Sequence, residues 1–250
     1  MSDFDRGLPR TARPGAADMA VDAGLRGFML GVYNKVALGL VWSAVLAYIT
    51  SSVPAVRDTL FAVTPDGRLA GLTVLGIAIG FAPLVLILFS SFVLRNPSPR
   101  TAGLLYWGIV SLIGASLGMW VLIYTGASIA TTFLVTAAAF GALSLWGYAT
   151  KRDLTGMGSF LMIGLVGLIV AMVANMFMHS PMIGFVVNIL GVLIFAGLIG
   201  YNTQRLKMTY YTLGGDQAAM SVATNYGALS LYIDFINLFQ FLMQFMGVRR

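Results

Sequence analysis

The sequence contains no cysteine and no glutamate, and it contains a single histidine, His179. Without cysteine the chain forms no disulfide, and it offers neither a thiolate metal site nor a thiol nucleophile. One histidine and no glutamate exclude His-Glu-x-x-His zinc chemistry and any site built from several imidazoles. Aspartate is left as the only acidic side chain, with nine copies, and we expect no tightly bound cofactor.

Charged residues are also scarce. They make up 10% of the 250 residues, whereas soluble globular proteins carry about 25%. Hydrophobic residues make up 58%, which is typical of an integral membrane protein in contact with the lipid bilayer. The formal charge of +6 comes from bases that lie mainly between apolar runs. These lysines and arginines act as topology signals. The sequence contains no motif for reading nucleic-acid bases, so we expect no nucleic-acid partner.

Long apolar runs dominate the chain. A helix needs about 20 apolar residues to cross the hydrocarbon core. Seven runs meet this need and predict an all-α polytopic membrane protein with seven transmembrane helices: 32–53, 69–94, 101–124, 127–149, 157–178, 182–204 and 222–246. Strands are not expected, because a barrel needs apolar/polar alternation. We expect tight hairpins at Thr125-Gly126 and at His179-Ser180-Pro181, one transmembrane domain over residues 28–250, and a polar, mobile cytoplasmic tail over residues 1–27.

Lysine and arginine counts give the orientation. Eleven bases lie in the tail, at the start of the first run, and in the links after the second, fourth and sixth runs, while four lie on the other side. This predicts a multi-pass protein of the cytoplasmic membrane with a cytoplasmic N-terminus and a C-terminus on the opposite side. If the seventh run is re-entrant instead, Arg249 and Arg250 move inside and the counts become thirteen and two. The charges leave that alternative open.

Asp234 lies in the middle of the seventh apolar run, ALSLYIDFINLFQFL. At 3.6 residues per turn, one face of this helix collects small and polar residues: Gly227, Ser230, Asp234, Asn237, then Gln240 or Gln244. A carboxylate at the centre of a membrane helix costs about 2.5–3.5 kcal/mol, so it is either protonated or partnered. The stripe predicts that the helix lies inside the bundle, with Asp234 at a polar cavity. Asp234 is then either a cation or proton site or a hydrogen bond between helices without a transport role.

Residues 114–118 fit G-x-S-x-G, the nucleophile elbow, with Ser116 at its centre. His179 is the only histidine available as its base. The elbow needs a strand–turn–helix context, whereas this segment is a continuous apolar run. We therefore expect helix packing here rather than a Ser116–His179 dyad, and no enzyme.

Four stretches carry a resemblance to a known family: MLGVYNKVALGLVWSAVLAY, DLTGMGSFLMIGLVGLIVAM, NILGVLIFAGLIGYNTQRLK and ALSLYIDFINLF. From about residue 24 to 247 the chain resembles the Bax inhibitor family, also called the transmembrane Bax inhibitor motif or lifeguard family, in its bacterial YccA-like branch. The resemblance implies seven helices with the seventh at the centre. It also implies a pH-sensitive calcium leak, in which one carboxylate on the sixth span and one on the seventh share protons and gate the pore.

Of these two carboxylates, the one on the seventh span matches Asp234. The other falls on Asn202, where the family pattern usually has aspartate (YDTQ rather than YNTQ). Two close carboxylates titrate as a coupled pair, whereas an Asn–Asp pair holds at most one titrating group. Calcium also prefers several oxygen ligands with more than one carboxylate. We therefore expect weaker or displaced pH gating, with Asp234 as a weak candidate calcium ligand. Asp234 can contact Asn202 only if the sixth helix continues past Arg205 or the two helices are offset.

The leading interpretation is a slow leak for cations, with calcium as the expected ion, in which Asn202, Ser230 and Asn237 lie near Asp234. The alternative is an interaction protein that restrains a membrane protease or protects membrane-protein quality control, as the resemblance to the YccA-like branch suggests. Deletion of the tail distinguishes the two, because loss of a protease partner with intact flux would favour the alternative.

Overall fold

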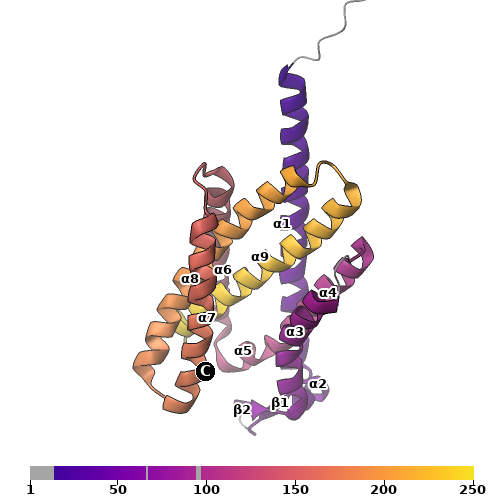
Figure 1. Ribbon diagram of the computed structural model, residues 1–250. Coiled ribbons are helices and arrows are strands. Elements are labelled where there is room, and N and C mark those ends of the chain that lie inside the picture. The colour runs from indigo at the N-terminus through magenta and orange to yellow at the C-terminus, as the bar shows by residue number, and fades with distance from the viewer. Residues whose placement is uncertain (1–13, 66, 94–96) are drawn as a thin grey trace, which may run out of the picture.

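The computed structural model describes residues 14–65, 67–93 and 97–250. The elements of this part of the chain are mostly helices (Figure 1): α1 Pro14–Ser52, α2 Pro54–Leu60, β1 Phe61–Val63, β2 Leu69–Leu72, α3 Val74–Val93, α4 Pro99–Ser116, α5 Gly118–Ile123, α6 Gly126–Ala149, α7 Thr155–Met178, α8 Pro181–Thr212 and α9 Gln217–Met246.

Six helical segments within the described residues are long and apolar enough to cross a membrane. They are Ala23–Ser52 of α1, Pro99–Ile123 of α4 and α5, and the helices α6, α7, α8 and α9. The all-α membrane architecture predicted from the sequence is confirmed, but the count of seven is not. α3 corresponds to the second predicted span, and its apolar stretch Val74–Ser90 is shorter than the other six segments.

The second predicted span begins with a strand, because residues 69–72 form β2. β2 pairs antiparallel with β1, with Phe61 opposite Leu72, and Gly67 adopts φ +76° between the strands. Phe61 is 2% exposed and belongs to a small apolar cluster that also contains residues of α5. α3 starts only after Thr73, whose hydroxyl oxygen accepts a hydrogen bond from a backbone N–H in the first turn of the helix. The expectation of helix from residue 69 is therefore wrong, since the hairpin buries Phe61 and sets a later helix start.

Two tight helical hairpins lie where the sequence predicts them. Tyr124 and Thr125 separate α5 from α6, and Thr125 caps α6 by accepting a hydrogen bond from the backbone N–H of Ser128. His179 and Ser180 separate α7 from α8. His179 adopts a left-handed conformation with φ 49°, and Ser180 accepts a hydrogen bond from the N–H of Ile183. Short polar caps thus reverse the chain between neighbouring spans.

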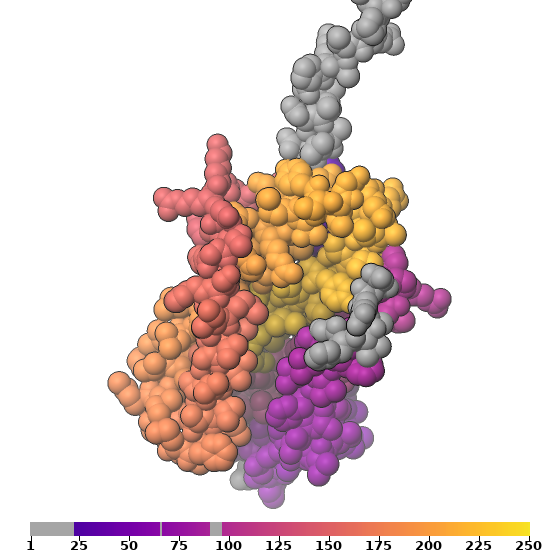
Figure 2. Space-filling view, in the orientation of Figure 1, coloured from indigo at the N-terminus to yellow at the C-terminus, as the bar shows by residue number. Residues whose placement is uncertain are grey.

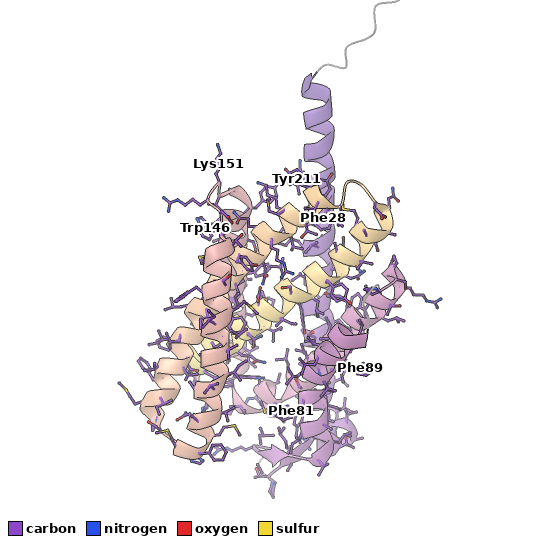
Figure 3. The ribbon with its side chains drawn as sticks, viewed as in Figure 1. Phe28, Phe81, Phe89, Trp146, Lys151 and Tyr211 are labelled. Atoms are coloured by element: carbon purple, nitrogen blue, oxygen red, sulfur yellow. The ribbon has the colours of Figure 1, made fainter. Side chains whose placement is uncertain are left out.

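α9 lies at the centre of the bundle. It packs against α1, α4, α6 and α8, and it crosses α1 diagonally in Figure 1. α7 by contrast packs mainly against α8. On the other flank, Phe81 and Phe89 of α3 point outward with exposed fractions of 64% and 62% (Figure 3). The central position expected for the last apolar run agrees with these contacts.

The helix that carries the first span begins well before that span. α1 starts at Pro14, so residues 14–27 of the predicted tail belong to this helix. In Figure 1 the N-terminal part of α1 extends beyond the rest of the bundle. Residues 1–13, the other part of the predicted tail, lie outside the described residues. The expected boundary at residue 28 is therefore not a break in the helix.

Candidate functional site

α8 continues through the basic cluster to Thr212, eight residues beyond the predicted end at residue 204. The Nζ atom of Lys207 donates to the backbone oxygen of Tyr148 on α6 at 3.1 Å, and it lies 5.1 Å from the centroid of the Tyr148 ring. A lysine can lay its stem along a neighbouring helix and keep its charged end near water. The basic cluster is therefore part of a packed helix, and the predicted helix end is wrong.

This extension brings Asn202 and Asp234 together. α9 begins after Asp216, whose Oδ1 atom accepts hydrogen bonds from the N–H groups of Ala218 and Ala219. Further along α9, the Oδ2 atom of Asp234 accepts a hydrogen bond from Nδ2 of Asn202 at 2.6 Å. Asn202 is 8% exposed and Asp234 is 4% exposed. The two positions singled out from the sequence are in direct contact inside the bundle.

The chemistry of the pair is limited by its composition. Asp234 is the only acidic residue within the six membrane-crossing segments. Asn202 donates an amide N–H and has no proton to release, so the pair contains one titratable group. In the described part of the chain, no cluster of three or more His, Cys, Asp or Glu side chains could hold a metal ion. Asn202 and Asp234 supply three side-chain oxygens at most, so a calcium ion held there would keep most of its water ligands.

A cleft of about 160 Å³ leads toward the pair between α8 and α9. Its wall includes Arg205 and Tyr226, and it also includes Asn202 and Ser230. Asp234 is not part of this wall, and it lies about one helical turn beyond Ser230. An ion or water molecule that moves from the cleft toward Asp234 therefore meets Asn202 and Ser230 first.

The remaining positions of the predicted stripe have other roles. Gly227 lets Leu206 of α8 pack directly on the α9 backbone, because a Cβ atom at position 227 would collide with the Leu206 side chain. Asn237 donates its side-chain N–H to the backbone oxygen of Ile233 in its own helix at 2.8 Å. The structure thus brings Asn202, Asp234 and Ser230 together, while Gly227 serves packing and Asn237 bonds within α9.

Sequence reasoning missed a second polar face of α9, which points toward α1. Lys35 of α1 donates its Nζ proton to Oδ1 of Asn225 at 2.6 Å, and the hydroxyl oxygens of Ser43 and Tyr232 lie 2.6 Å apart. At 3.6 residues per turn, Asn225 and Tyr232 share a face roughly opposite Asp234. The available signal was Lys35, which lies inside the first predicted span, because a base at that depth needs a polar partner.

A sequence profile described as "Inhibitor of apoptosis-promoting Bax1" matches residues 25–250. The chain belongs to the Bax inhibitor family. An uncharacterized protein of Caulobacter vibrioides is 67% identical over the full length of both chains. The protein RP147 of Rickettsia prowazekii is 40% identical, also over both full lengths. The inner membrane protein YbhL of Escherichia coli K12 is 38% identical over 91% of this chain and 94% of its own.

The family and the fold agree on where the protein resides. YbhL is an inner membrane protein, and this Bax inhibitor family member has six apolar helices in its described part that can cross a membrane. It is therefore a multi-pass protein of the cell membrane. The family resemblance drawn from the YNTQ and YIDF stretches is confirmed.

Ser116 and His179 do not form a dyad in this Bax inhibitor family member. The Ser116 hydroxyl donates to a backbone oxygen of its own helix at 2.7 Å, and Nδ1 of His179 lies 3.1 Å from a backbone oxygen of α7. The glycine at the start of the motif has a packing role, because a Cβ atom at Gly114 would lie 2.7 Å from Cα of Ser43. The G-x-S-x-G spacing therefore allows close contact between α4 and α1.

Proposed function

We propose that this protein is a slow, pH-sensitive leak for cations, with calcium as the ion, and that Asn202 and Asp234 control it. The observation that carries the proposal is the buried hydrogen bond of 2.6 Å between these two side chains on α8 and α9. Membership of the Bax inhibitor family supports it as well. An acidic group inside a membrane protein is functional by default, because its burial is costly.

The route to Asp234 starts at the cleft between α8 and α9. Because the cleft ends at Asn202 and Ser230, an ion reaches Asp234 only when the Asn202 side chain moves or turns its Oδ1 atom toward the ion. Calcium binds through oxygen atoms, so the amide N–H that now faces Asp234 opposes its entry. The closed pair is therefore the resting state of the proposed leak, and opening requires water to enter between α8 and α9.

The same pair explains why pH control should be weak. Two adjacent carboxylates share a proton and titrate over a coupled range. Asn202 provides an amide instead, so proton uptake at Asp234 receives no contribution from a second charge. Conversion of position 202 to aspartate would create the coupled pair and a stronger cation site.

The decisive experiment measures calcium flux into liposomes from pH 5 to pH 8. We expect a small leak from the wild type with weak pH dependence, a larger pH-dependent leak from Asn202→Asp, and no leak from Asp234→Asn. Asn237→Ala is the matched control, because Asn237 is polar and on the same helix but bonds to its own backbone. It should behave like the wild type.

The proposal fails if the wild type and Asn202→Asp show no flux above empty vesicles at any pH. An equal leak from wild type and Asp234→Asn would also contradict it, because the carboxylate would then have no part in conduction.

A second candidate is a binding protein for a membrane protease or for another component of membrane-protein quality control. The N-terminal part of α1 favours it, because this helical segment extends beyond the rest of the bundle (Figure 1). Deletion of residues 1–22 tests it. Loss of protease copurification with unchanged calcium flux would establish binding as the function, whereas unchanged copurification would remove this candidate.

A further inference from the structure

Four basic side chains surround a cleft of about 470 Å³ at one end of the bundle. Lys151 and Arg152 come from the link between α6 and α7, and Arg205 and Lys207 come from α8. We call these four residues and the space between them the basic pocket. Figure 2 shows the link between α6 and α7 (salmon) at the edge of the molecule, beside the end of α8 (orange). The pocket joins segments about 50 residues apart in the sequence.

The wall of the basic pocket is held in place by Gln204. Its Oε1 atom accepts a hydrogen bond from the N–H of Leu154 at 2.8 Å, and its Nε2 atom donates to the backbone oxygen of Arg152 at 2.7 Å. One side chain of α8 thus fastens the middle and the C-terminal end of the link. Because the backbone that carries Lys151 and Arg152 is fixed, it need not be ordered when a ligand binds, which lowers the entropic cost of binding.

The positive charge of the basic pocket is not neutralised within the protein. Asp153 also lines the pocket, but its Oδ1 atom accepts hydrogen bonds from the backbone and the hydroxyl of Thr155. These bonds hold the pKa of Asp153 below its usual value, so it stays ionised at neutral pH. The ion pair that the described residues form joins Arg57 and Asp58, which do not line the pocket. Four cations and one anion therefore leave a net charge of +3 around the pocket.

The basic pocket lies at the membrane surface. Lys151 and Arg152 lie in the link between Ala149, the last residue of α6, and Thr155, the first residue of α7. Trp146 lies one turn inside α6, is 46% exposed, and sits just below Lys151 in Figure 3. Exposed tryptophans gather at the level of lipid head groups. The pocket wall also contains Met208, which is 58% exposed, so charged and apolar surfaces meet there.

We infer that the basic pocket binds the head group of an anionic phospholipid. The phosphate is held by Lys151, Arg152 and Arg205, and the acyl chains pass Trp146 into the bilayer. A basic pocket between membrane helices that lies at head-group depth has the charge and location for this ligand. The exposed Trp146 on the membrane side of the pocket favours a lipid over a soluble phosphate, because a soluble ion gains nothing from an apolar surface.

The test uses Trp146 as a reporter in the full-length protein. The other tryptophans, Trp42, Trp107 and Trp120, are replaced by phenylalanine. The protein is reconstituted in vesicles, and quenching of Trp146 fluorescence by brominated phosphatidylglycerol is compared with quenching by brominated phosphatidylcholine. We expect an approximately tenfold preference for the anionic lipid, and a roughly fivefold or greater loss of that preference in Lys151→Gln/Arg152→Gln.

Two control variants keep the test decisive. Lys151→Arg/Arg152→Lys retains both charges and should retain the preference, so a loss there would indicate damage to the fold. Arg57→Gln/Arg68→Gln removes two bases near α2 and the β1–β2 hairpin, at the opposite end of the bundle in Figure 1, and should leave Trp146 quenching unchanged.

Three results would overturn the inference. Equal quenching by both lipids in the reporter protein means that no anionic-lipid site lies near Trp146. A preference that persists in Lys151→Gln/Arg152→Gln places the lipid elsewhere. In the third result, inorganic phosphate stabilises the protein in phosphatidylcholine vesicles, this stabilisation requires Lys151 and Arg152, and Trp146 quenching shows no preference for the anionic lipid. That result would assign the pocket to a soluble phosphate instead.

Discussion

α9 and α7 are both long and apolar enough to cross the membrane, yet 56% of the most apolar stretch of α9 is buried and only 11% of that of α7. α7 exposes Phe160 and Phe177 by 73% and 80%, while α9 buries Asn225 and Asp234. Lipid tails offer no hydrogen bonds, so polar groups are satisfied only inside the bundle, and a uniformly apolar helix can face lipid at no cost. In this fold the helix with the more polar sequence lies at the centre.

Replacing glycine by alanine should give the largest difference in stability loss between the central and the peripheral helices. A Cβ atom at Gly147 of α6 would lie 2.8 Å from Cα of Gly200 on α8, and backbone atoms cannot move aside cheaply. Gly147→Ala should lower the free energy of unfolding by about 3 kcal/mol. Gly167 of α7 has nothing within 4 Å of its Cβ position, so Gly167→Ala should cause no loss. Unfolding by denaturing detergent measures both, and equal losses would contradict the distinction.

Removal of an aromatic ring should also destabilise the protein more in α9 than in α7, but the difference in unfolding free energy should be smaller. Phe235 of α9 is 2% exposed, and its ring centroid lies 5.5 Å from those of Phe133 and Phe140. Phe235→Ala should cost about 2 kcal/mol, because lost packing remains even when lipid replaces water as the solvent. Phe160→Ala on α7 should stay within about 0.5 kcal/mol of the wild type. The same unfolding assay reports both, and a cost at Phe160 as large as that at Phe235 would remove the contrast.

A single interhelical hydrogen bond should matter less. Tyr232→Phe removes the contact with Ser43, whose hydroxyl keeps its bond to the backbone oxygen of Gly39 at 2.8 Å. We expect a loss of about 0.6 kcal/mol, the average for hydrogen bonds between membrane helices. Ser159→Ala on α7 is the control, since the exposed Ser159 hydroxyl bonds only within its own helix. A loss above about 2 kcal/mol for Tyr232→Phe would mean that the bond belongs to a larger coupled network.

The smallest effect concerns the solvent-exposed start of α7. Thr155 lowers the pKa of Asp153 through two hydrogen bonds, so Asp153 contributes stability above its unfolded-state pKa of 3.8. That contribution is lost as the pH falls through the lower folded-state pKa. Thr155→Val should move the Asp153 pKa upward toward its ordinary value, as measured by the carboxyl resonance in an NMR titration. An unchanged midpoint would show that Thr155 does not control Asp153.

The sequence was sufficient to predict the central helix and to single out Asp234 on it and Asn202 on the preceding helix. Asp234 stands out because it is an acid in an apolar run. Asn202 is one of several polar residues near the end of the sixth run, and the family pattern assigns it as the partner. Their contact was not predictable from helix ends, because Arg205 and Lys207 look like the cytoplasmic end of a span. Only the structure shows that Lys207 packs on Tyr148 while α8 continues.

Other errors have equally local causes. Residues 69–72 are apolar enough for a span but form a strand, because pairing with residues 61–63 satisfies their backbone groups. The Lys35–Asn225 contact was missed because a lysine near the start of a span serves equally well as a topology signal. The hairpin depends on pairing between two short neighbouring segments, and the Lys35–Asn225 contact depends on a partner 190 residues away. Periodicity and composition reveal neither.

The order of the helices along the chain has a consequence for biosynthesis. α9 is made after the other described helices, yet Lys35 and Asn202 on those earlier helices have their partners, Asn225 and Asp234, on it. Until α9 has been synthesised, Lys35 and Asn202 lie in the membrane or the translocon without their final hydrogen bonds. The preceding helices can insert one by one and pack in pairs such as α1 with α4 and α7 with α8, but their core is complete only after α9 is inserted. The final assembly of this bundle is therefore a post-insertion event.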